Sequence, residues 1–370
     1  MRGQIHRSVN GLAKEKQRIE RGPVVMQKKT GWGLAALAMA SLLVIGWLVP
    51  QDPDEARWED YLDRIARLSR QALPERAPLP LLPYPGASEL RLSLPEHRVN
   101  LLDYLELRHC GLMELISQRN SSLGKLQADS LRLSHELAFI AQARACLERE
   151  KLDDPELVTV MSQVVAEKEA ALPALYWNVL ASSEEIRRFF SQSPSASVGD
   201  TSAALQSLEQ LSHTLVDHKQ RGAVTPLNLE PLLETLAHNQ SGGYLLRRMA
   251  LSLRELERGN QLLEGIDPQR LCPRNQASTR ARRLRNVLDK VWGPRVQQAL
   301  AESRRQRQSL ADSLEQMNGL LDSPPAAFTR WHRHYFGQNG VESRMETALE
   351  RHVTLWQEHL GACGLMPGKP

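Results

Sequence analysis

The stretch "DEARWEDYLDRIARLSRQAL", Asp54–Leu73, decides the fold class. Its apolar residues recur at the spacing of one face of an α-helix: Trp58, Tyr61, Leu62, Ile65 and Leu68. The same type of pattern dominates the chain from Val99 onward, whereas the alternating patterns typical of β-strands are nearly absent. The sequence therefore predicts an all-α, multi-helix fold.

Six prolines crowd the stretch that follows this helix, "PERAPLPLLPYPGASELRLSLPEHR", Pro74–Arg98. Proline restricts φ and lacks a backbone N–H donor, so such a stretch favours extended structure over helix. Its leucines can lie in grooves between helices. We therefore expect a strap that crosses the fold rather than a free linker.

Composition also suggests how the chain is divided. "SQSPSASVGD", 191–200, is the best candidate boundary between helical regions. We expect one helical region over 54–190, which includes the strap, and a second over 200–366 that packs with the first as one unit. Ahead of them we expect a basic cytoplasmic tail over 1–30 and a membrane anchor over 31–49.

The anchor is predicted from "GWGLAALAMASLLVIGWLV", nineteen residues without a charge. At about 1.5 Å per residue, such a helix spans roughly the 30 Å hydrocarbon core of a bilayer. Trp32 and Trp47 lie near its ends, and Lys28 and Lys29 precede it, as expected for an N-terminus that stays inside. No small-x-small cleavage site follows, so we expect an uncleaved signal anchor. Met26 is an alternative start, and residues 1–25 would then not belong to the protein.

The basic charge lies in the tail and does not indicate a nucleic-acid partner. Residues 1–29 carry eight Lys or Arg and two acidic residues, a net charge of +6, and the whole chain has a formal net charge of +4. The remainder therefore carries −2. This asymmetry is typical of membrane topology, with the folded region in the periplasm and a single pass through the inner membrane.

All four cysteines follow the predicted anchor, and an even number beyond an export signal indicates disulfides. Four cysteines allow three pairings. Helix geometry favours Cys110 with Cys146, on successive helices, and Cys272 with Cys363, on either side of a returning hairpin. On an unbroken helix Cys110 would point away from the apolar stripe, so either Gly111 breaks the helix or the helix is buried on two sides.

The candidate ligand site is "RNSSLGK", Arg119–Lys125. It is not a phosphate loop, because the pattern G-x-x-x-x-G-K-[ST] fails at both ends. One interpretation is a polar turn in which Asn120 or Ser121 ends a helix and Gly124 takes a positive φ. The alternative is capture of an anion by cationic and hydroxyl side chains. The candidate residues are Arg119, Asn120, Ser121, Ser122 and Lys125.

The remaining clusters of polar residues do not indicate a metal site or a catalytic site. The late histidines, which include His352 and His359, lack the spacing of a metal site and are expected at the surface or at interfaces. The arginine-rich segments "RARRLRNVLDK" and "SRRQRQ" are interpreted as solvated helix faces, or as a surface for anionic lipid. We predict no catalytic residues, no metal and no cofactor.

Four segments carry a resemblance to a known family: "LSLPEHRVNLLDYLELRHCGLMELISQRNSSLGKL", "LSHELAFIAQARACL", "LPALYWNVLASSEEIRRFF" and "WQEHLGACGL". Over most of residues 55–366 the chain resembles an uncharacterised family of Gram-negative cell-envelope proteins, usually lipoproteins. The resemblance implies an envelope location but no activity. The chain departs from the lipoprotein pattern, because it reads "LVPQDP" where a lipid-modified cysteine would stand.

The sequence therefore favours a membrane-tethered, non-catalytic binding or scaffolding module of the cell envelope. Its expected partners are the membrane, through the N-terminal helix, and an envelope protein or an anionic envelope component, and not nucleic acid. The alternative is an envelope enzyme with dispersed catalytic residues, such as one that acts on peptidoglycan.

Overall fold

A computed structural model describes residues 52–95, 107–125, 127–149, 154–192 and 200–366. All regular secondary structure in these ranges is helical, which confirms the predicted all-α class. The anchor predicted over 31–49 and the basic tail over 1–30 lie outside the described residues. None of the described helices combines the length and the apolar character needed to cross a lipid bilayer.

Residues Asp52–Pro370 form one compact unit. Its first half contains α2 (Pro53–Ser69), α3 (Ala87–Leu90), the 3-10 turn η1 (Leu107–Cys110), α5 (Leu112–Asn120), α6 (Ser122–Lys125), α7 (Asp129–Glu148), α8 (Pro155–Trp177), the π-helix η2 (Asn178–Ser182) and α9 (Glu184–Phe189). Its second half contains α10 (Thr201–Arg221), α11 (Glu230–Ala237), α12 (Ser241–Glu264), α13 (Pro268–Leu271), the turn η3 (Pro273–Asn275), α14 (Thr279–Val287), the π-helix η4 (Leu288–Gln297), α15 (Gln298–Asn318), α16 (Ala326–Phe336) and α17 (Val341–Ala362).

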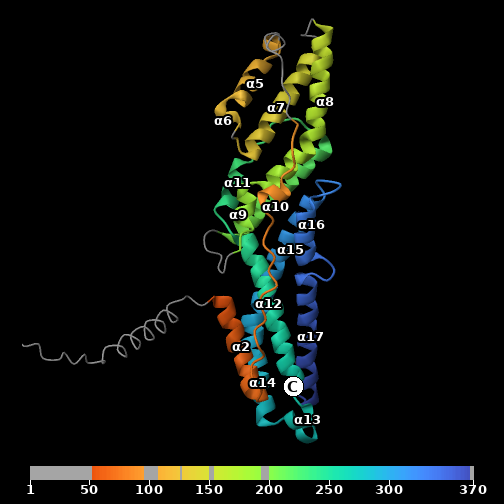
Figure 1. The fold of residues 1–370 in the computed structure, drawn as a ribbon. Helices are drawn as coiled ribbons and strands as arrows, with labels where there is room; N and C mark the ends of the chain where they lie inside the picture. The colour runs from red at the N-terminus through yellow and green to blue at the C-terminus, as the bar shows by residue number, and fades with distance from the viewer. Residues whose placement is uncertain (1–51, 96–106, 126, 150–153, 193–199, 367–370) are drawn as a thin grey trace, which may run out of the picture. The chain divides into compact units, whose positions relative to one another are not determined.

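Helix α12 is the centre of one half of the unit, where it packs against α17 and α2 (Figure 1). The close approach of the three helices depends on Gly259. A Cβ at this position would lie 2.9 Å from a ring carbon of His352 on α17 and 3.2 Å from a methyl carbon of Leu62 on α2. Any side chain at residue 259 would therefore push these helices apart.

A long helical run from Thr279 to Asn318 consists of α14, η4 and α15. Pro294 stands inside it, where a proline removes one backbone hydrogen bond and clashes with the preceding turn. The structure accommodates Pro294 through the wider π-helical turns of η4. Trp292 and Val296 are thereby directed into the core.

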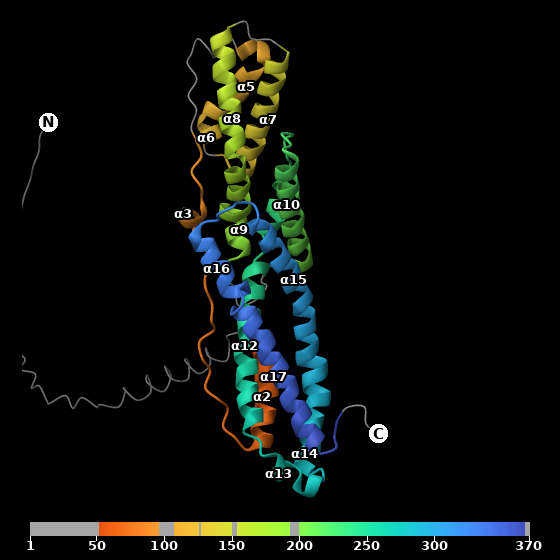
Figure 2. The same ribbon diagram turned by 90° about the vertical axis from the view of Figure 1, so that its right-hand side faces the viewer.

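The proline-rich strap runs as an extended segment beside the helices (Figure 2). Side chains of α12 and α16 bind it. Residues 71–86 form neither helix nor strand, and one helical turn, α3, follows. The buried guanidinium of Arg258 on α12 donates from Nε and Nη2 to the Pro74 carbonyl, at 3.0 and 2.8 Å. Tyr335 on α16 accepts a hydrogen bond from the Leu82 N–H and donates one to the Leu82 carbonyl, both at 2.8 Å. The tyrosine hydroxyl thus pairs with both backbone groups of one residue, as a neighbouring β-strand would.

The far end of the strap is held in the same way. The Asn178 amide on η2 accepts from the Leu92 N–H and donates to the Leu92 carbonyl, both at 2.9 Å. Trp177 Nε1 donates to the Leu90 carbonyl at 2.7 Å. These contacts give the strap backbone the partners that a helix or a sheet would otherwise provide.

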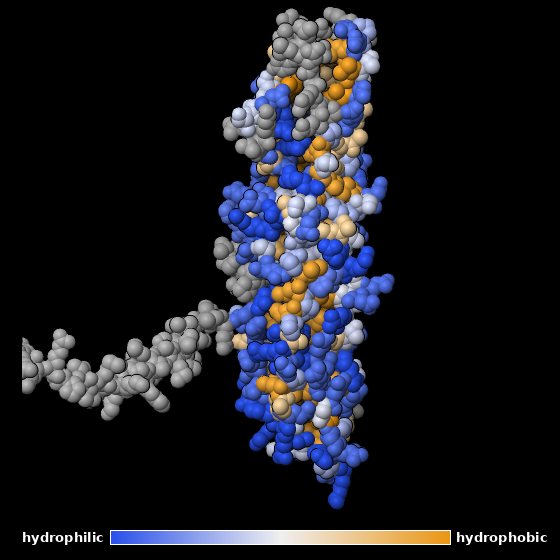
Figure 3. Space-filling model, in the orientation of Figure 1, coloured by the Kyte–Doolittle hydropathy of each residue, from blue (hydrophilic) through white to orange (hydrophobic). Residues whose placement is uncertain are grey.

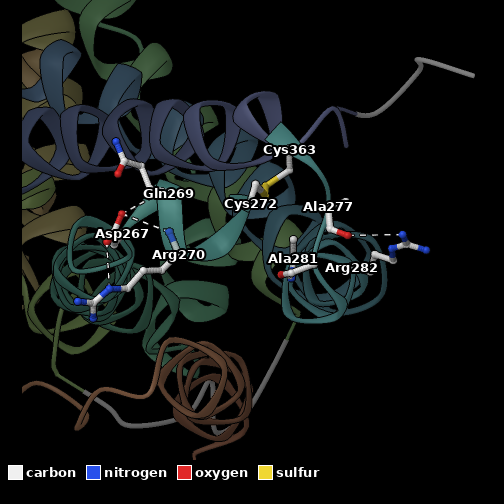
Figure 4. Close-up of a disulfide and its surroundings, with 9 residues drawn as sticks. Asp267, Gln269, Arg270, Cys272, Ala277, Ala281, Arg282 and Cys363 are labelled. Atoms are coloured by element: carbon white, nitrogen blue, oxygen red, sulfur yellow. Dashed lines mark hydrogen bonds and ion pairs between the residues drawn. A yellow bond between two sulfur atoms is a disulfide. The ribbon is translucent and has the colours of Figure 1, made fainter. Parts of the chain in front are cut away.

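Both predicted disulfides are confirmed: Cys110 with Cys146, and Cys272 with Cys363, each with its Cα atoms 5.3 Å apart. Gly111 explains how Cys110 can point into the core. Its φ of 71° ends η1 at Cys110 and begins α5, so the cysteine lies on a separate turn and points into the core. The second bridge joins the end of α17 to the residue after α13 (Figure 4).

Replacing Cys272 and Cys363 together with serine should lower the free energy of unfolding. The bridge joins residues 91 positions apart, and in the chain-entropy model a loop of this size contributes at most about 4.6 kcal/mol. Urea unfolding of the full chain, followed by far-UV circular dichroism, measures the loss.

The matched control replaces Cys110 and Cys146, which are 36 positions apart, and should cost at most about 4 kcal/mol. Mass spectrometry of each non-reduced variant should show the other bridge intact, because neither loop contains the other pair of cysteines. A crossed or missing bridge in either variant would contradict this independence.

Candidate functional site

The sequence-predicted ligand site, Arg119–Lys125, forms a corner between two helices. Asn120 ends α5, Ser121 follows as its C-cap, and Ser122 begins α6, which ends at Lys125. The Ser121 hydroxyl donates to the Gln118 carbonyl at 2.7 Å and accepts from the Gly124 N–H at 2.9 Å. Arg119 donates through Nη1 to the Gly124 carbonyl. This geometry matches the turn interpretation, while capture of an anion here stays a prediction.

The expectation of a positive φ at Gly124 is wrong. Gly124 lies inside α6, and the glycines with positive φ in the described residues are Gly111, Gly222 and Gly364. The physical reason for glycine is close contact, because a Cβ at residue 124 would lie 2.0 Å from the Gln118 carbonyl oxygen. The corner is therefore too tight for any other residue.

The expectation of surface or interfacial positions for the last histidines is also wrong for His352 and His359, which are both buried. His359 Nε2 donates to the Leu263 carbonyl at 2.8 Å, so its ring connects α17 to α12. Within the described residues, no group of three or more His, Cys, Asp or Glu side chains is arranged to hold a metal ion.

A chain of hydrogen bonds through His352 joins three helices inside the core. Trp356 Nε1 donates to the Tyr61 hydroxyl at 2.8 Å, and the Tyr61 hydroxyl lies 2.5 Å from His352 Nε2. His352 Nδ1 lies 2.8 Å from the Asn260 side-chain oxygen, and Asn260 Nδ2 donates to the Ala348 carbonyl at 2.9 Å. If Tyr61 donates to Nε2 and Nδ1–H donates to Asn260, the side-chain donors of Trp356, Tyr61 and His352 all have acceptors.

This arrangement requires a neutral imidazole. Burial disfavours the imidazolium and lowers the pKa of His352 to about 3, and burial likewise raises the pKa of Tyr61 well above its usual value. Neither group is accessible to solvent. This chain of hydrogen bonds therefore acts as a structural connection between helices, not as a proton relay to a substrate.

The rings that cover this chain also form a wall of a surface groove. The Trp292 ring on η4 lies 4.5 Å from the His352 ring, and Trp356 lies one turn further along α17. Both indoles line a hollow of about 360 Å³ between η4 and α17. Its apolar lining is Leu288, Trp292, Val353, Trp356, Leu360 and Met366.

A second hollow of about 360 Å³ continues the first toward α15, and the two share Trp292, Gln297 and Val353. Its floor is Leu300, Met345 and Leu349, and its charged lining is Arg304, Arg307, Glu346 and Glu350. We call the two hollows together the groove. Each alone reaches the lower part of the range of about 300–1,000 Å³ typical of ligand pockets.

The polar end of the groove contains a buried arginine that is incompletely paired. Arg307 is 4% exposed, donates through Nη1 to the Ser303 hydroxyl at 3.2 Å, and has Nε 3.6 Å from Glu342. Its Nε has no hydrogen-bond partner. Burial lowers the pKa of Arg307 and raises the pKa of Glu342, so both charges are poorly solvated.

Sequence reasoning missed the groove because its two sides come from segments that α16 separates along the chain. A weak signal was present in Val353, an apolar residue among polar neighbours on the outer face of α17 that is 38% exposed. The face shown in Figure 3 is mainly hydrophilic with separate hydrophobic patches, so single exposed apolar residues are not diagnostic by themselves.

Residues 58–367 match the family described as "Protein of unknown function (DUF3080)". No curated protein and no solved structure matches the chain.

Acidification should destabilise the fold through His352. The unfolded histidine, with a pKa near 6.5, binds a proton that the folded residue, with a pKa of about 3, does not. Stability from this group is therefore complete above pH 6.5 and falls as the pH drops toward 3, with a loss of about 2 kcal/mol by pH 5. Denaturant midpoints at pH 7.5 and 5 measure the change.

In His352→Gln, the difference in unfolding free energy between these two pH values should shrink by about the same amount, roughly 2 kcal/mol. His213→Gln, at an exposed position on α10, controls for the substitution itself. An unchanged pH dependence in His352→Gln would show that this residue is not the acid-sensitive group.

Proposed function

Because the chain belongs to this family of unknown function, we propose from its own geometry that it is a binding module of the cell envelope. The module is anchored in the inner membrane by residues 31–49 and extends into the periplasm. The groove between η4, α15 and α17 is its binding site. The observation that carries the proposal is the apolar lining that this groove receives from Trp292, Trp356 and Val353, of which Val353 is 38% exposed.

The character of the lining supports binding. Apolar walls with a few charged groups at one end are typical of ligand sites, because the apolar surface provides affinity and the polar groups orient the ligand. The lining contains no serine, cysteine or histidine that would form a nucleophile and base pair. These features favour a binding role over catalysis by a serine or cysteine nucleophile.

Two features support the periplasmic location. All four cysteines are in disulfides, and such bonds persist in oxidising compartments such as the periplasm. The uncharged segment over 31–49, with Lys28 and Lys29 before it, is typical of an anchor whose C-terminal side is exported.

The compartment can be tested with the native protein. Full chain isolated from its own envelope in the presence of an alkylating agent should carry no alkylated cysteine and should show both bridges by peptide mass spectrometry. Four alkylated thiols in freshly isolated material would reject the periplasmic location.

The groove can be tested with a photocrosslinking amino acid placed at residue 353 in living cells. We expect a specific adduct there, because a bound ligand or partner would contact this side chain. The matched control carries the same amino acid in place of Val160 on α8, which is 43% exposed and lies outside the groove lining.

The substitution Val353→Glu should abolish function in any cellular assay that depends on the protein, whereas Val160→Glu should not. Equal adducts at both positions, or none at residue 353, would contradict the proposed function.

A further inference from the structure

We infer that the arginine-rich end of the folded unit docks on the surface of a bilayer that contains anionic phospholipid. This surface consists of residues 70–73 at the end of α2 and residues 270–283 in α13, η3 and the start of α14, and we call it the basic end. It shares no lining residue with the groove. The inference goes beyond the proposed function and uses only one element of it, the membrane anchor.

The first step concerns the distribution of charge. Residues 267–290 contain seven Lys or Arg and two acidic residues, a net charge of +5. Residues 30–370 as a whole carry −2, so those outside this segment carry −7. The end of α2, α13 and α14 lie together at one end of the unit (Figure 2). Positive charge is therefore concentrated at this end.

The second step concerns ion pairs. The Asp267 carboxylate lies 3.3 Å from Arg270 Nε, and the Asp289 carboxylate lies 2.6 Å from Arg285 Nε. Both acidic residues of the segment are thus already paired. Its other four arginines make no ion pair with any residue that the structure describes: Arg274, Arg280, Arg282 and Arg283. Their charge is available to an external anion.

The third step concerns the position of these four arginines along the helix. Ser278 caps α14 by accepting a hydrogen bond from the Ala281 N–H at 3.1 Å, so the arginines precede α14 or lie in its first two turns. The helix dipole places partial positive charge there and disfavours cations. The first turn contains no acidic residue to compensate. Stability of the helix therefore does not account for these arginines, whereas an anionic surface would.

The core-facing side of α14 directs arginines outward. Ala281 and Leu284 are buried, and the intervening Arg282 and Arg283 are exposed. Figure 4 shows Arg282 directed away from the Cys272–Cys363 bridge, with its Nη2 3.5 Å from the Ala277 carbonyl. The two guanidinium groups can therefore contact headgroups without a change in the fold.

An apolar neighbour favours lipid over a soluble polyanion. The end of α2 packs beside α12, where Gln71 Nε2 donates to the Leu262 carbonyl at 2.9 Å, and α2 also packs against α14. Two residues after Gln71, Leu73 is 38% exposed. Binding at a bilayer interface combines attraction to anionic headgroups with insertion of apolar side chains. The basic end provides both.

The proposed anchor keeps a bilayer within reach of the basic end. The anchor ends at Val49, and α2 begins at Pro53 and has 17 residues. The linking residues span at most about 11 Å, and α2 is about 25 Å long. The bilayer is thus within about 40 Å of the basic end along the chain, and docking is effectively intramolecular.

The test uses the full chain in nanodiscs of phosphatidylcholine, either alone or in an equal mixture with phosphatidylglycerol. A fluorescent amino acid replaces Leu73, and a trace of lipid with a nitroxide headgroup quenches it only at close range. Quenching should be strong in the anionic discs and weak in the neutral discs. At about 1 M salt, where the Debye length is about 3 Å, this difference should disappear. The same amino acid in place of Val160 on α8 should be quenched weakly in both discs.

Matched variants separate the basic end from general attraction. Arg282→Glu with Arg283→Glu reverses two adjacent exposed charges on α14, and Arg304→Glu with Arg305→Glu makes the same change on α15. An arginine near an anionic surface raises the binding constant about fivefold, so the α14 pair should lower the ratio of docked to undocked protein at least about 25-fold. The α15 pair should leave this ratio unchanged.

The inference is overturned if residue 73 is quenched equally in neutral and anionic discs, or if the two variant pairs have equal effects. A fluorophore that responds to soluble polyphosphate but not to the anionic discs would also reject it, because the basic end would then bind a polyanion. These outcomes leave the groove unaffected. Failure of the anchor is measured separately, as release of the full chain from neutral vesicles. Salt-sensitive binding to anionic vesicles that only the α14 pair weakens would still support the basic end in that case.

Discussion

The hydrogen bond between Tyr61 and His352 is the contact on which the arrangement of the helices depends. It joins residues 291 positions apart, deep in the core. Through Trp356 and Asn260 the same chain of hydrogen bonds fixes α2, α12 and α17 relative to one another. Because every buried polar atom in the chain needs its own partner, a rotation or slide of one helix would leave a donor or an acceptor unpaired, at a cost of about 1–3 kcal/mol. The wall of the groove is fixed in the same way, because Trp292 and Trp356 both contact these hydrogen-bonded residues and line the groove.

The strap shows how a helical protein can fix an irregular segment against its helices. Proline residues cannot donate hydrogen bonds, so the contacts along the strap are mainly to its carbonyl oxygens, as at Pro74 and Pro80. Where a non-proline residue offers both groups, one side chain accepts and donates together: Tyr335 does so at Leu82 and Asn178 at Leu92. Side chains thereby replace the strand that an extended segment usually requires.

Much of the fold could be predicted from local patterns. Helical spacing located the helices, the prolines indicated an extended strap, and the positions of the cysteines between helices gave both bridges. Contacts that join distant segments could not be predicted in this way. Nothing near His352 in the sequence indicates that Tyr61 and Asn260 surround it, so it was expected at the surface or at an interface. The groove was missed for the same reason. The need for glycine at residue 124 was attributed to a positive φ, because its close contact with the Gln118 carbonyl is seen only in three dimensions.

The separation between Tyr61 and His352 also governs the order in which the chain can fold. The N-terminal helix α2 leaves the ribosome long before α17, and at about 5–20 residues per second the interval is roughly 15–60 s. During this time the Tyr61 hydroxyl lacks His352 and Trp356, whereas α12, α14 and η4, which pack against α2, are made earlier. The strap likewise cannot be held until α12 and α16 exist. The apolar face of α2 can therefore be covered before synthesis ends, but the buried hydrogen bonds of Tyr61 can form only when the last helix has been made.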